Sequence, residues 1–379
     1  MLSKRLSGIE ESATIKMGQI AKKLQEEGKE VLNFSLGEPD FKTPEHICEA
    51  AKHALDLGYT HYVSSAGIEE LRGEIAKKIR EENKVDASME NVIVTPGAKQ
   101  AIYELMMSVL DEGDEVILLD PAWVTFESAV KISGGVPKWV KRVEKSVNYE
   151  SLESAASGNT KLVVINSPNN PAGYVLSEKE LKEIAEFAVE HDLLVLSDEI
   201  YEKIIYGRKQ LSIASFDGMQ ERTVIINGFS KTYAMTGWRI GYAVAPSEIV
   251  KGMLKIQQHS VTCASSISQF AALTALRDSQ ECVKEMVGEF KRRRDAIVKR
   301  LNEIGLRCLN PEGAFYAFVN TSNHGDDVEF TERLLKEAYI AVTPGSAFGL
   351  AGKNYVRFSF AASIEDILEG MKRIESTLL

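Results

Sequence analysis

The segment INGFSKTYAMTGWRIGY, residues 226–242, places a single lysine, Lys231, eight residues before an arginine, Arg239. A lysine near a buried strand end and a second cation can have its pKa lowered enough to act as a nucleophile. The alternatives are a solvated surface lysine and a structural lysine that pairs with a carboxylate. The segment alone does not distinguish a reactive lysine from these two alternatives. The residues that follow the neighbouring apolar runs are needed to distinguish them.

Two of these runs are followed by residues that suit an anion and a flat ligand. After NVIVT, Gly97, Ala98 and Lys99 open a helix, whose first N–H groups and dipole favour negative charge. Trp123 follows EVILLD and can present a flat face to a planar ligand. Taken singly, the first could be an ordinary strand–helix junction and the second a core residue.

Two further runs end in groups that suit a cationic ring. SPNNPAG follows KLVVIN and forms a stiff turn that presents the amide of Asn170. Asp198 ends LLVLSD, with Tyr201 in the next turn, and a buried carboxylate needs a cationic partner. Together with Lys231, these groups describe a planar ligand with an anionic end, a ring cation and a bond to lysine. Pyridoxal 5′-phosphate (PLP) has each of these features.

These residues must be positioned by a scaffold that brings strand ends together. Nearly continuous apolar runs, typical of strands covered on both faces, predict strands at 91–95, 115–120, 161–166, 193–198, 223–227 and 240–245. Amphipathic segments separate them, and SEKE at 177–180 has capping-box spacing. We expect an α/β fold whose mostly parallel sheet is sandwiched by helices and binds ligands at the strands' carboxyl ends.

The pattern changes near residue 285, where fewer strands with stricter alternation predict a smaller α+β domain. We expect an N-terminal arm and part of the small domain at 1–45, a large PLP-binding domain at 46–284 and a C-terminal small domain at 285–379. The arm should hold one helix. The basic run KRRR at 291–294 is expected to be a solvated helix face.

Composition narrows the class of protein. With 379 residues, 44% hydrophobic and 26% charged, the chain is typical of a globular protein. A net charge of −10 argues against nucleic acid as the main partner. There is no apolar run long enough for a membrane span and no secretory signal, and four scattered cysteines without a CxxC pair suggest neither disulfides nor a structural zinc. We expect a cytoplasmic protein with no metal site.

Seven segments together, in this order, resemble the class I/II aminotransferases of PLP fold type I, closest to the aspartate/aromatic branch. The resemblance covers nearly the whole chain and is carried by SLGEPDF, HYVSSAGIEELR, TPGAKQA, SPNNPAG, SDEIYE, SKTYAMTGWRIGY and YVRFSFA. It implies ping-pong transfer of an amino group from an L-amino acid, expected to be aspartate, to a 2-oxo acid, expected to be 2-oxoglutarate. An aromatic or broad-specificity aminotransferase, another PLP reaction such as a β-lyase, and a non-catalytic PLP-binding regulator are the alternatives.

The resemblance also implies roles around the cofactor ring. Lys231 matches the lysine that forms the internal aldimine and carries the substrate proton as general base and acid. Asp198 matches the residue that keeps the pyridine nitrogen protonated. Asn170 and Tyr201 match the pair that hydrogen-bonds the ring's 3′ oxygen, and Trp123 matches the aromatic residue that stacks on the ring.

The phosphate is expected to be held by the backbone of Gly97, Ala98 and Lys99 together with Arg239. Tyr62 matches a tyrosine that reaches the phosphate of the partner subunit, which implies a homodimer with shared active sites.

One position departs from the family pattern. Gly228 stands where members that contact the phosphate through a hydroxyl have Ser or Thr, and Ser230 is the candidate substitute.

Arg357 in YVRFSFA matches the arginine that binds the substrate α-carboxylate, helped by the backbone of Gly37, with Trp123 and Asn170 beside the substrate. Thr14, in Ser12-Ala13-Thr14, lies in a segment that resembles one touching the distal carboxylate in aspartate enzymes. Where some of those enzymes carry a lysine along the TPGAKQA helix, this chain has MM at 106–107, which would favour aromatic or broad substrates.

Overall fold

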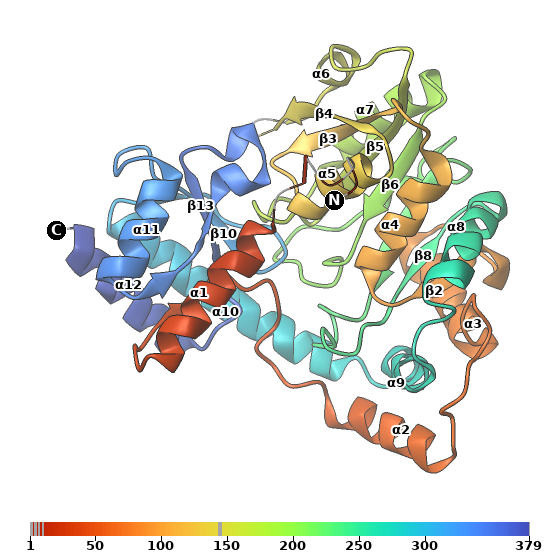
Figure 1. Ribbon diagram of the computed structural model, residues 1–379, viewed down its shortest axis with the longest axis horizontal. Coiled ribbons are helices and arrows are strands. Elements are labelled where there is room, and N and C mark those ends of the chain that lie inside the picture. The colour runs from red at the N-terminus through yellow and green to blue at the C-terminus, as the bar shows by residue number, and fades with distance from the viewer. Residues whose placement is uncertain (1–2, 4–5, 7, 10, 143–145, 379) are drawn as a thin grey trace.

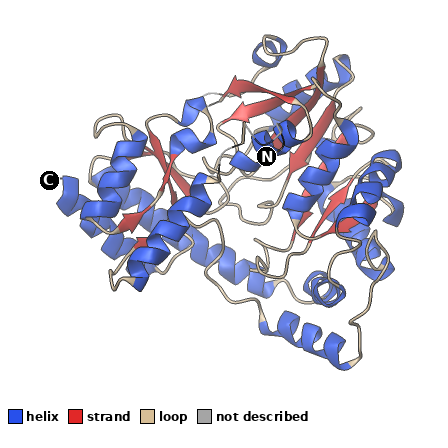
Figure 2. Cartoon of the chain, viewed as in Figure 1, coloured by secondary structure: helices blue, strands red, loops and turns tan. Residues whose placement is uncertain are grey.

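The computed structural model describes residues 3, 6, 8–9, 11–142 and 146–378. In Figure 1 a larger lobe is built around a long twisted sheet, and a smaller lobe contains both α1 near the beginning of the chain and α12 at its end. Figure 2 shows helices lying on both sides of the sheet in the larger lobe. The expected α/β architecture, with a mostly parallel sheet between helices, is confirmed.

The larger lobe contains a seven-stranded sheet in the order β2-β8-β7-β6-β5-β3-β4. Its strands are β2 (Val92–Thr95), β3 (Glu115–Asp120), β4 (Val136–Lys141), β5 (Thr160–Asn166), β6 (Leu194–Asp198), β7 (Thr223–Gly228) and β8 (Gly241–Val244). Neighbours run parallel except at β8, which is antiparallel to both β2 and β7. The six predicted strands are confirmed. The seventh, β4, lies at the sheet edge and is largely accessible, so its sequence VPKWVK lacks the apolar run of the others.

The helices of the larger lobe are α2 (Glu45–Asp56), α3 (Glu69–Lys78), α4 (Ala98–Val109), α5 (Val124–Ile132), α6 (Tyr149–Glu153), α7 (Glu178–Glu190), α8 (Ser247–Ser260) and α9 (Ser266–Arg277). Most of them pack against this sheet, whereas α2 packs mainly against α9. A π-helical turn (Ile79–Asn83) extends α3, and short 3₁₀ turns lie at Met89–Asn91 and Ile213–Ser215. The predicted capping box of α7 forms: Glu180 N donates to Ser177 Oγ, and Ser177 N donates to Glu180 Oε2.

The smaller lobe is built on a four-stranded antiparallel sheet in the order β12-β13-β10-β9. Its strands are β9 (Arg307–Cys308), β10 (Tyr316–Asn320), β12 (Thr343–Pro344) and β13 (Tyr355–Ser359), and its helices are α11 (Asp327–Glu337) and α12 (Ile364–Leu378). Two 3₁₀ turns, Gly345–Phe348 and Leu350–Gly352, precede β13. The N-terminal arm holds α1 (Ala13–Glu26) and β1 (Leu32–Asn33), and β1 pairs in parallel with β11 (Ile340–Ala341).

The longest helix, α10 (Glu281–Glu303), contacts both lobes, as Figure 1 shows. Its first turn places Val283 in the core of the larger lobe, whereas Phe290 and Ile297 pack in the core of the smaller one. The domain boundary expected near residue 285 therefore falls inside a continuous helix, and it stays a prediction.

The basic run of α10 is only half solvated. Lys291 and Arg292 are exposed, but the next two arginines are buried. Arg293 donates to Asp40 at 2.6 Å, and the guanidinium of Arg294 lies 4.8 Å from the ring centroid of Tyr206. The expectation of a solvated face is wrong for these two residues, because one side of the helix turns them against the protein.

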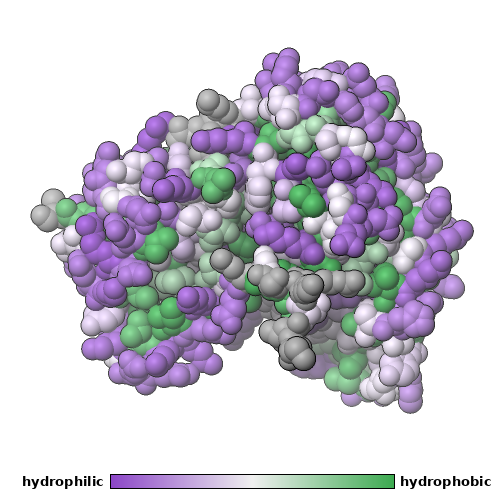
Figure 3. All heavy atoms as spheres, turned by 45° about the horizontal axis from the view of Figure 1, so that its top comes forward, coloured by the Kyte–Doolittle hydropathy of each residue, from purple (hydrophilic) through white to green (hydrophobic). Residues whose placement is uncertain are grey.

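Hydrophilic side chains cover most of the face shown in Figure 3, and hydrophobic ones form small separate patches there. Within the described residues, no helix is long and apolar enough to cross a membrane.

Candidate active site

A cavity of about 280 Å³ opens at the carboxyl ends of β5, β6 and β7, where they face β13 and the N-terminal arm. It gathers nearly all of the predicted site residues from segments far apart in the sequence. Those that line it are Thr14, Gly37, Ala98, Lys99, Trp123, Asn170, Asp198, Tyr201, Ser230, Lys231, Arg239 and Arg357. Gly97 lies immediately beside the cavity, and Tyr62 lies outside it.

Lys231 follows the end of β7 and points into the cavity, where its Nζ donates a hydrogen bond of 2.6 Å to the carbonyl of Gly37. Burial, with the nearby charges of Arg239 and Arg357, lowers the pKa of Lys231 to about 8, although Glu38 acts in the opposite direction. A larger neutral fraction near neutral pH makes this amine a better nucleophile than an ordinary lysine.

Asp198 ends β6, next to Lys231, and its carboxylate is 3% exposed. It accepts a hydrogen bond of 3.1 Å from the N–H of Ile200. Neither Lys231 nor any other described side chain forms an ion pair with it, so a purely structural Lys231–Asp198 pair is not what the structure contains. Burial raises the pKa of Asp198 to about 7. A buried carboxylate with this environment suits a cationic N–H partner supplied by a ligand.

Arg357 lies on β13 with its side chain 1% exposed, and it too forms no ion pair with a described residue. Its Nη1 donates to Asn170 Oδ1 at 2.9 Å and its Nη2 to the carbonyl of Ser35 at 2.6 Å. Its Nε is buried without an acceptor in the described part of the chain. The rings of Tyr316 and Phe348 lie 4.6 and 5.0 Å from the guanidinium carbon. Because a buried cation without a counter-ion is costly, this arrangement favours an anionic ligand.

Tyr316, which lines the same cavity, was not among the predicted site residues. Its hydroxyl lies 2.8 Å from that of Tyr201, and the two rings meet edge to face. A Cβ on Gly37 would come within 2.9 Å of the Tyr316 hydroxyl, so a larger residue here would have to displace that side chain. An aromatic residue in an apolar segment is usually a core residue, so the sequence gave no signal for Tyr316.

A cationic region forms where α4 begins. The positive φ of Gly97, 86°, and the closeness of its Cα to Arg239 leave no room for a side chain, because an added Cβ would lie 2.7 Å from Arg239 Nη2. The first N–H groups of α4 have no partner within the helix. The ammonium of Lys99 lies 4.9 Å from the ring centroid of Trp123, and burial together with Arg239 lowers the pKa of Lys99. This end of the cavity suits a strongly anionic group.

The departure at Gly228 has a steric reason. A Cβ at this position would lie 2.9 Å from the Cα of Gly241 and 3.1 Å from the carbonyl oxygen of Ile240, both in the paired strand region. Serine or threonine cannot occupy this backbone without moving β8. Ser230 does line the cavity, as the sequence suggested.

The two methionines of α4 do not support the inference drawn from them. Met106 is fully buried in the core of the larger lobe and Met107 is 49% exposed, and neither lines the cavity. The expectation that they favour aromatic substrates is therefore wrong. Instead, Ser12 and Thr14 line the cavity at the start of α1, with their hydroxyl oxygens 2.8 Å apart.

Tyr62 is 84% exposed and does not reach the cavity of its own chain. Its role at the partner subunit's phosphate stays a prediction.

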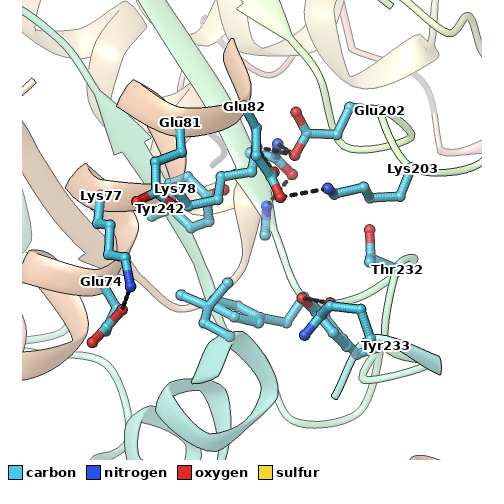
Figure 4. A pocket seen from close by; sticks show the side chains of 15 residues that line it. Glu74, Lys77, Lys78, Glu81, Glu82, Glu202, Lys203, Thr232, Tyr233 and Tyr242 are labelled. Atoms are coloured by element: carbon cyan, nitrogen blue, oxygen red, sulfur yellow. Dashed lines mark hydrogen bonds and ion pairs between the residues drawn. The ribbon is translucent and has the colours of Figure 1, made fainter. Parts of the chain in front are cut away.

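Acidic and basic side chains, among them Lys78, Glu82, Glu202 and Lys203, come together in the pocket shown in Figure 4. Glu202 pairs with Lys78 and accepts a hydrogen bond of 2.8 Å from Asn227 Nδ2. Asn83 Nδ2 bridges Glu202 and Glu199, at 3.0 and 2.8 Å. Burial, with the charge of Glu202, raises the pKa of Glu199 to about 7. The cluster joins α3 and its π-helical turn to the ends of β6 and β7, and the sequence gave no sign of it beyond the acidic run DEIYE.

Comparison with known proteins agrees with this geometry. The family model "Aminotransferase class I and II" matches residues 29–374. An aspartate aminotransferase of Pyrococcus abyssi is 46% identical, covering 100% of this chain and 98% of the relative, and aromatic-amino-acid aminotransferase 2 of Thermococcus litoralis is 45% identical with the same coverage. The structure of Thermus thermophilus aspartate aminotransferase with maleate has a TM-score of 0.96 and 40% identity, and covers 100% of this chain and 99% of that one. The chain therefore belongs to the class I and II aminotransferases, a family of PLP-dependent enzymes.

Proposed function

We propose that the protein transfers the amino group of L-aspartate to 2-oxoglutarate, with PLP as its cofactor and Lys231 as the reactive amine. The observation that carries the proposal is the buried guanidinium of Arg357, which forms no ion pair with a described residue and shares the cavity with the low-pKa amine of Lys231. A cation that can bind a substrate carboxylate and an amine that can move a proton are the two protein groups that amino transfer requires.

The residues of the cavity fit PLP at both of its ends. Asp198 is a buried carboxylate that has no ion pair with any residue in the described ranges, which suits a protonated pyridine nitrogen. Arg239 and the first turn of α4 provide cationic and N–H groups for a phosphate, and Trp123 provides a face for the ring. Asn170 uses its Oδ1 for Arg357 and so keeps its amide N–H groups available for a ring oxygen. When bound, PLP supplies an electron sink for the negative charge that develops at the substrate Cα.

The protein's own groups then orient the substrate and move its proton. Arg357 binds the α-carboxylate, and its hydrogen bonds to Asn170 and Ser35 fix the plane of the guanidinium. Fixing that carboxylate fixes the direction of the Cα–H bond, which directs the reaction to proton loss. Lys231, released from its hydrogen bond to Gly37, takes the proton from Cα as general base and returns it as general acid.

Lys99 supports an acidic substrate. Among the residues that the structure describes, four cationic side chains line the cavity: Lys99, Lys231, Arg239 and Arg357. Lys231 is the reactive amine, Arg239 lies against Gly97 at the phosphate end, and Arg357 binds the α-carboxylate. Lys99 is the remaining cation, and the hydroxyls of Ser12 and Thr14 line the same cavity. Aspartate and 2-oxoglutarate both carry the second carboxylate that such a cation would bind.

Aromatic amino acids are the second candidate substrates. Trp123 and Ile15 add apolar surface to the cavity, and one relative of 45% identity is named an aromatic-amino-acid aminotransferase. The ammonium of Lys99 already lies over the Trp123 ring, so it can stay there when the substrate brings no second carboxylate.

We also propose a homodimer in which Tyr62 completes the phosphate site of the partner subunit. Tyr62 is 84% exposed, so its ring and hydroxyl are accessible to a second chain. All four cysteines are free, which suits the reducing cytoplasm.

The decisive experiment is a panel of L-amino acids offered singly to the PLP-loaded enzyme, with the spectrum of the cofactor recorded before 2-oxoglutarate is added. Aspartate should convert the cofactor to its amino form fastest, and 2-oxoglutarate should restore the starting spectrum. A faster reaction with phenylalanine or tyrosine would favour the aromatic alternative. Release of pyruvate, ammonia and the β-substituent from cysteine, with the cofactor spectrum back at its starting form before any 2-oxoglutarate is added, would indicate a β-lyase and overturn the proposal.

A further inference from the structure

Tyr316 of β10 contacts two residues of the active-site cavity that have separate roles in the proposed function. It lines the cavity and is fully buried in the core of the smaller lobe. Its hydroxyl lies 2.8 Å from that of Tyr201, which follows β6 of the larger lobe. The centroid of its ring lies 4.6 Å from the guanidinium carbon of Arg357. One side chain therefore connects a residue expected at the cofactor ring with one expected at the substrate carboxylate.

The two tyrosine hydroxyls have one proton more than they can share. Within the described residues, neither the hydroxyl of Tyr201 nor that of Tyr316 has another hydrogen-bond partner. Burial raises the pKa of both groups, that of Tyr201 far above its usual range, so both stay protonated at neutral pH. Each phenol has one proton to donate, and only one of the two protons can lie between the oxygens. The other O–H needs an acceptor, which a ligand in the cavity can supply.

The expected role of Tyr201 fixes the direction of the hydrogen bond between the two hydroxyls. If Tyr201 donates its proton to the 3′ oxygen of the PLP ring, the proton between the two tyrosines must come from Tyr316. Arg357 favours the same direction, because a positive charge against the ring of Tyr316 makes that phenol a better proton donor.

We propose that Tyr316 is a positioning residue, which donates a hydrogen bond to Tyr201 and holds the guanidinium of Arg357 with its ring. The inference rests on the proposed function, in which PLP accepts from Tyr201 and a substrate carboxylate binds Arg357. The hydrogen bond that Tyr201 receives strengthens the one that it donates, because successive hydrogen bonds polarise one another. The ring of Tyr316 restricts the guanidinium in addition to the hydrogen bonds from Nη1 and Nη2.

The first test is a spectrophotometric pH titration of the PLP-loaded enzyme, which reports the pKa of the nitrogen that joins Lys231 to PLP. A hydrogen bond to the 3′ oxygen stabilises the negative charge that remains there when this nitrogen loses its proton, and so lowers the pKa. Tyr201→Phe should therefore raise the pKa by about 1–2 units, the effect of one hydrogen bond to a charged group. Tyr316→Phe should raise it by roughly 0.1–0.6 unit, because one hydrogen bond strengthens the next by about 10–30%. In the Tyr201→Phe background, Tyr316→Phe should add no shift.

The second test is calorimetric binding of succinate or 3-phenylpropionate to the PLP-loaded enzyme, with whichever of the two the wild type binds more tightly. Neither compound has an amino or a 2-oxo group, so the measurement is independent of turnover. Tyr316→Phe keeps the ring and should leave Kd nearly unchanged. Tyr316→Leu removes the ring, and Kd should rise by about 3- to 10-fold, part of the roughly 5- to 30-fold that ordering a free arginine side chain costs. An unchanged Kd in Tyr316→Leu, or no binding of either acid to the wild type, would overturn the role assigned to the ring.

Tyr206→Phe is the matched control. The hydroxyl of Tyr206 is buried in the same core and donates to the carbonyl of Ala314 at 2.6 Å, and its ring also lies against an arginine, Arg294. Tyr206 does not line the cavity, so this variant should change neither the pKa nor Kd. An equal pKa shift in Tyr206→Phe, no shift in Tyr316→Phe, or an undiminished shift when Tyr201→Phe is already present would each overturn the inference. An unchanged pKa in Tyr201→Phe would overturn the proposed role of Tyr201 as well, which distinguishes the two failures.

Discussion

Replacing Asp198 with asparagine should stabilise the cofactor-free protein while disabling the enzyme. Asp198 is 3% exposed, receives one hydrogen bond from the Ile200 N–H and has no ion pair with a described residue. In the cofactor-free protein, one hydrogen bond does not offset the cost of burying the negative charge of Asp198. A cationic ring nitrogen would offset it. Asparagine has nearly the same shape without the charge, so Asp198→Asn removes that cost.

The magnitude follows from the pKa of Asp198. Burial raises it from an ordinary value of 3.8 to about 7. The folded protein therefore binds this proton more tightly than the unfolded chain does, and its stability falls as pH rises from about 4 to about 7 and then stays constant. At about 1.4 kcal/mol per pKa unit, the full cost above pH 7 is up to roughly 4 kcal/mol. We expect Asp198→Asn to recover roughly 1 to 4 kcal/mol there, because the asparagine amide must itself be buried.

The assay is thermal unfolding of the cofactor-free wild type and variant at pH 5 and pH 8.5. For a chain of this length the gain corresponds to roughly 1 to 5 °C at pH 8.5, with a smaller difference at pH 5. The PLP-loaded variant should lose about 10²–10³-fold in kcat, the usual effect of removing one electrostatic contact made in the transition state. Asp327→Asn is the matched control, because that buried carboxylate accepts N–H bonds from Ser346 and Asn354 and the change should destabilise. An Asp198→Asn variant that is less stable at pH 8.5, or whose gain is independent of pH, would refute the reasoning.

Three other predictions concern the remaining charges of the cavity. Lys231→Ala should abolish turnover and the borohydride fixation of PLP. In the cofactor-free wild type, the rate at which Lys231 captures PLP should rise with pH and level off above about 8, which stopped-flow absorbance would measure. Arg357→Gln should lower kcat/KM for aspartate and phenylalanine alike by about 10²–10³-fold while PLP still binds, since both substrates share the α-carboxylate. Lys99→Met should lower kcat/KM for aspartate by about 5- to 30-fold and should change kcat/KM for phenylalanine by no more than about twofold. The loss is in the lower part of the range for a charged hydrogen bond because Lys99 is partly solvated. Lys16→Met, an exposed lysine on α1, is its control, and equal losses for both substrates would contradict the assignment of Lys99.

The sequence predicted the strands and the ligand edge of the larger lobe well, for a physical reason. Strands buried on both faces must be apolar throughout, so a polar group that follows such a run is conspicuous. Asp198 and Asn170 were chosen as candidates in this way, and both line the cavity, although their roles stay predictions. The edge strand β4 was not predicted, because its side chains are partly exposed to solvent and therefore need not be apolar.

Groups that act through tertiary contacts could not be found from the sequence. Tyr316 reaches Tyr201 from β10, across 115 residues of chain, and Asn83 reaches Glu199 across 116. In the sequence, nothing distinguishes Tyr316 or Asn83 from the residues around it, because both contacts form only when the chain folds. Lys99 was assigned through its backbone alone, whereas the structure places its ammonium over Trp123. A helix start predicts the direction of the backbone N–H groups and says little about where a long flexible side chain lies.

Asp198 and Arg357 carry opposite charges and are buried in the same cavity, yet they do not pair with each other, and their hydrogen bonds suggest why. Direct pairing would satisfy both, but Asn170 occupies Arg357 Nη1 and Ile200 N–H occupies the carboxylate. Each charge therefore remains available to a different ligand, Asp198 to a cationic ring and Arg357 to a carboxylate. A direct pair would have made the empty protein more stable and would have blocked both ligands. It follows that PLP and a dicarboxylate should stabilise the protein independently, because each compensates a different buried charge.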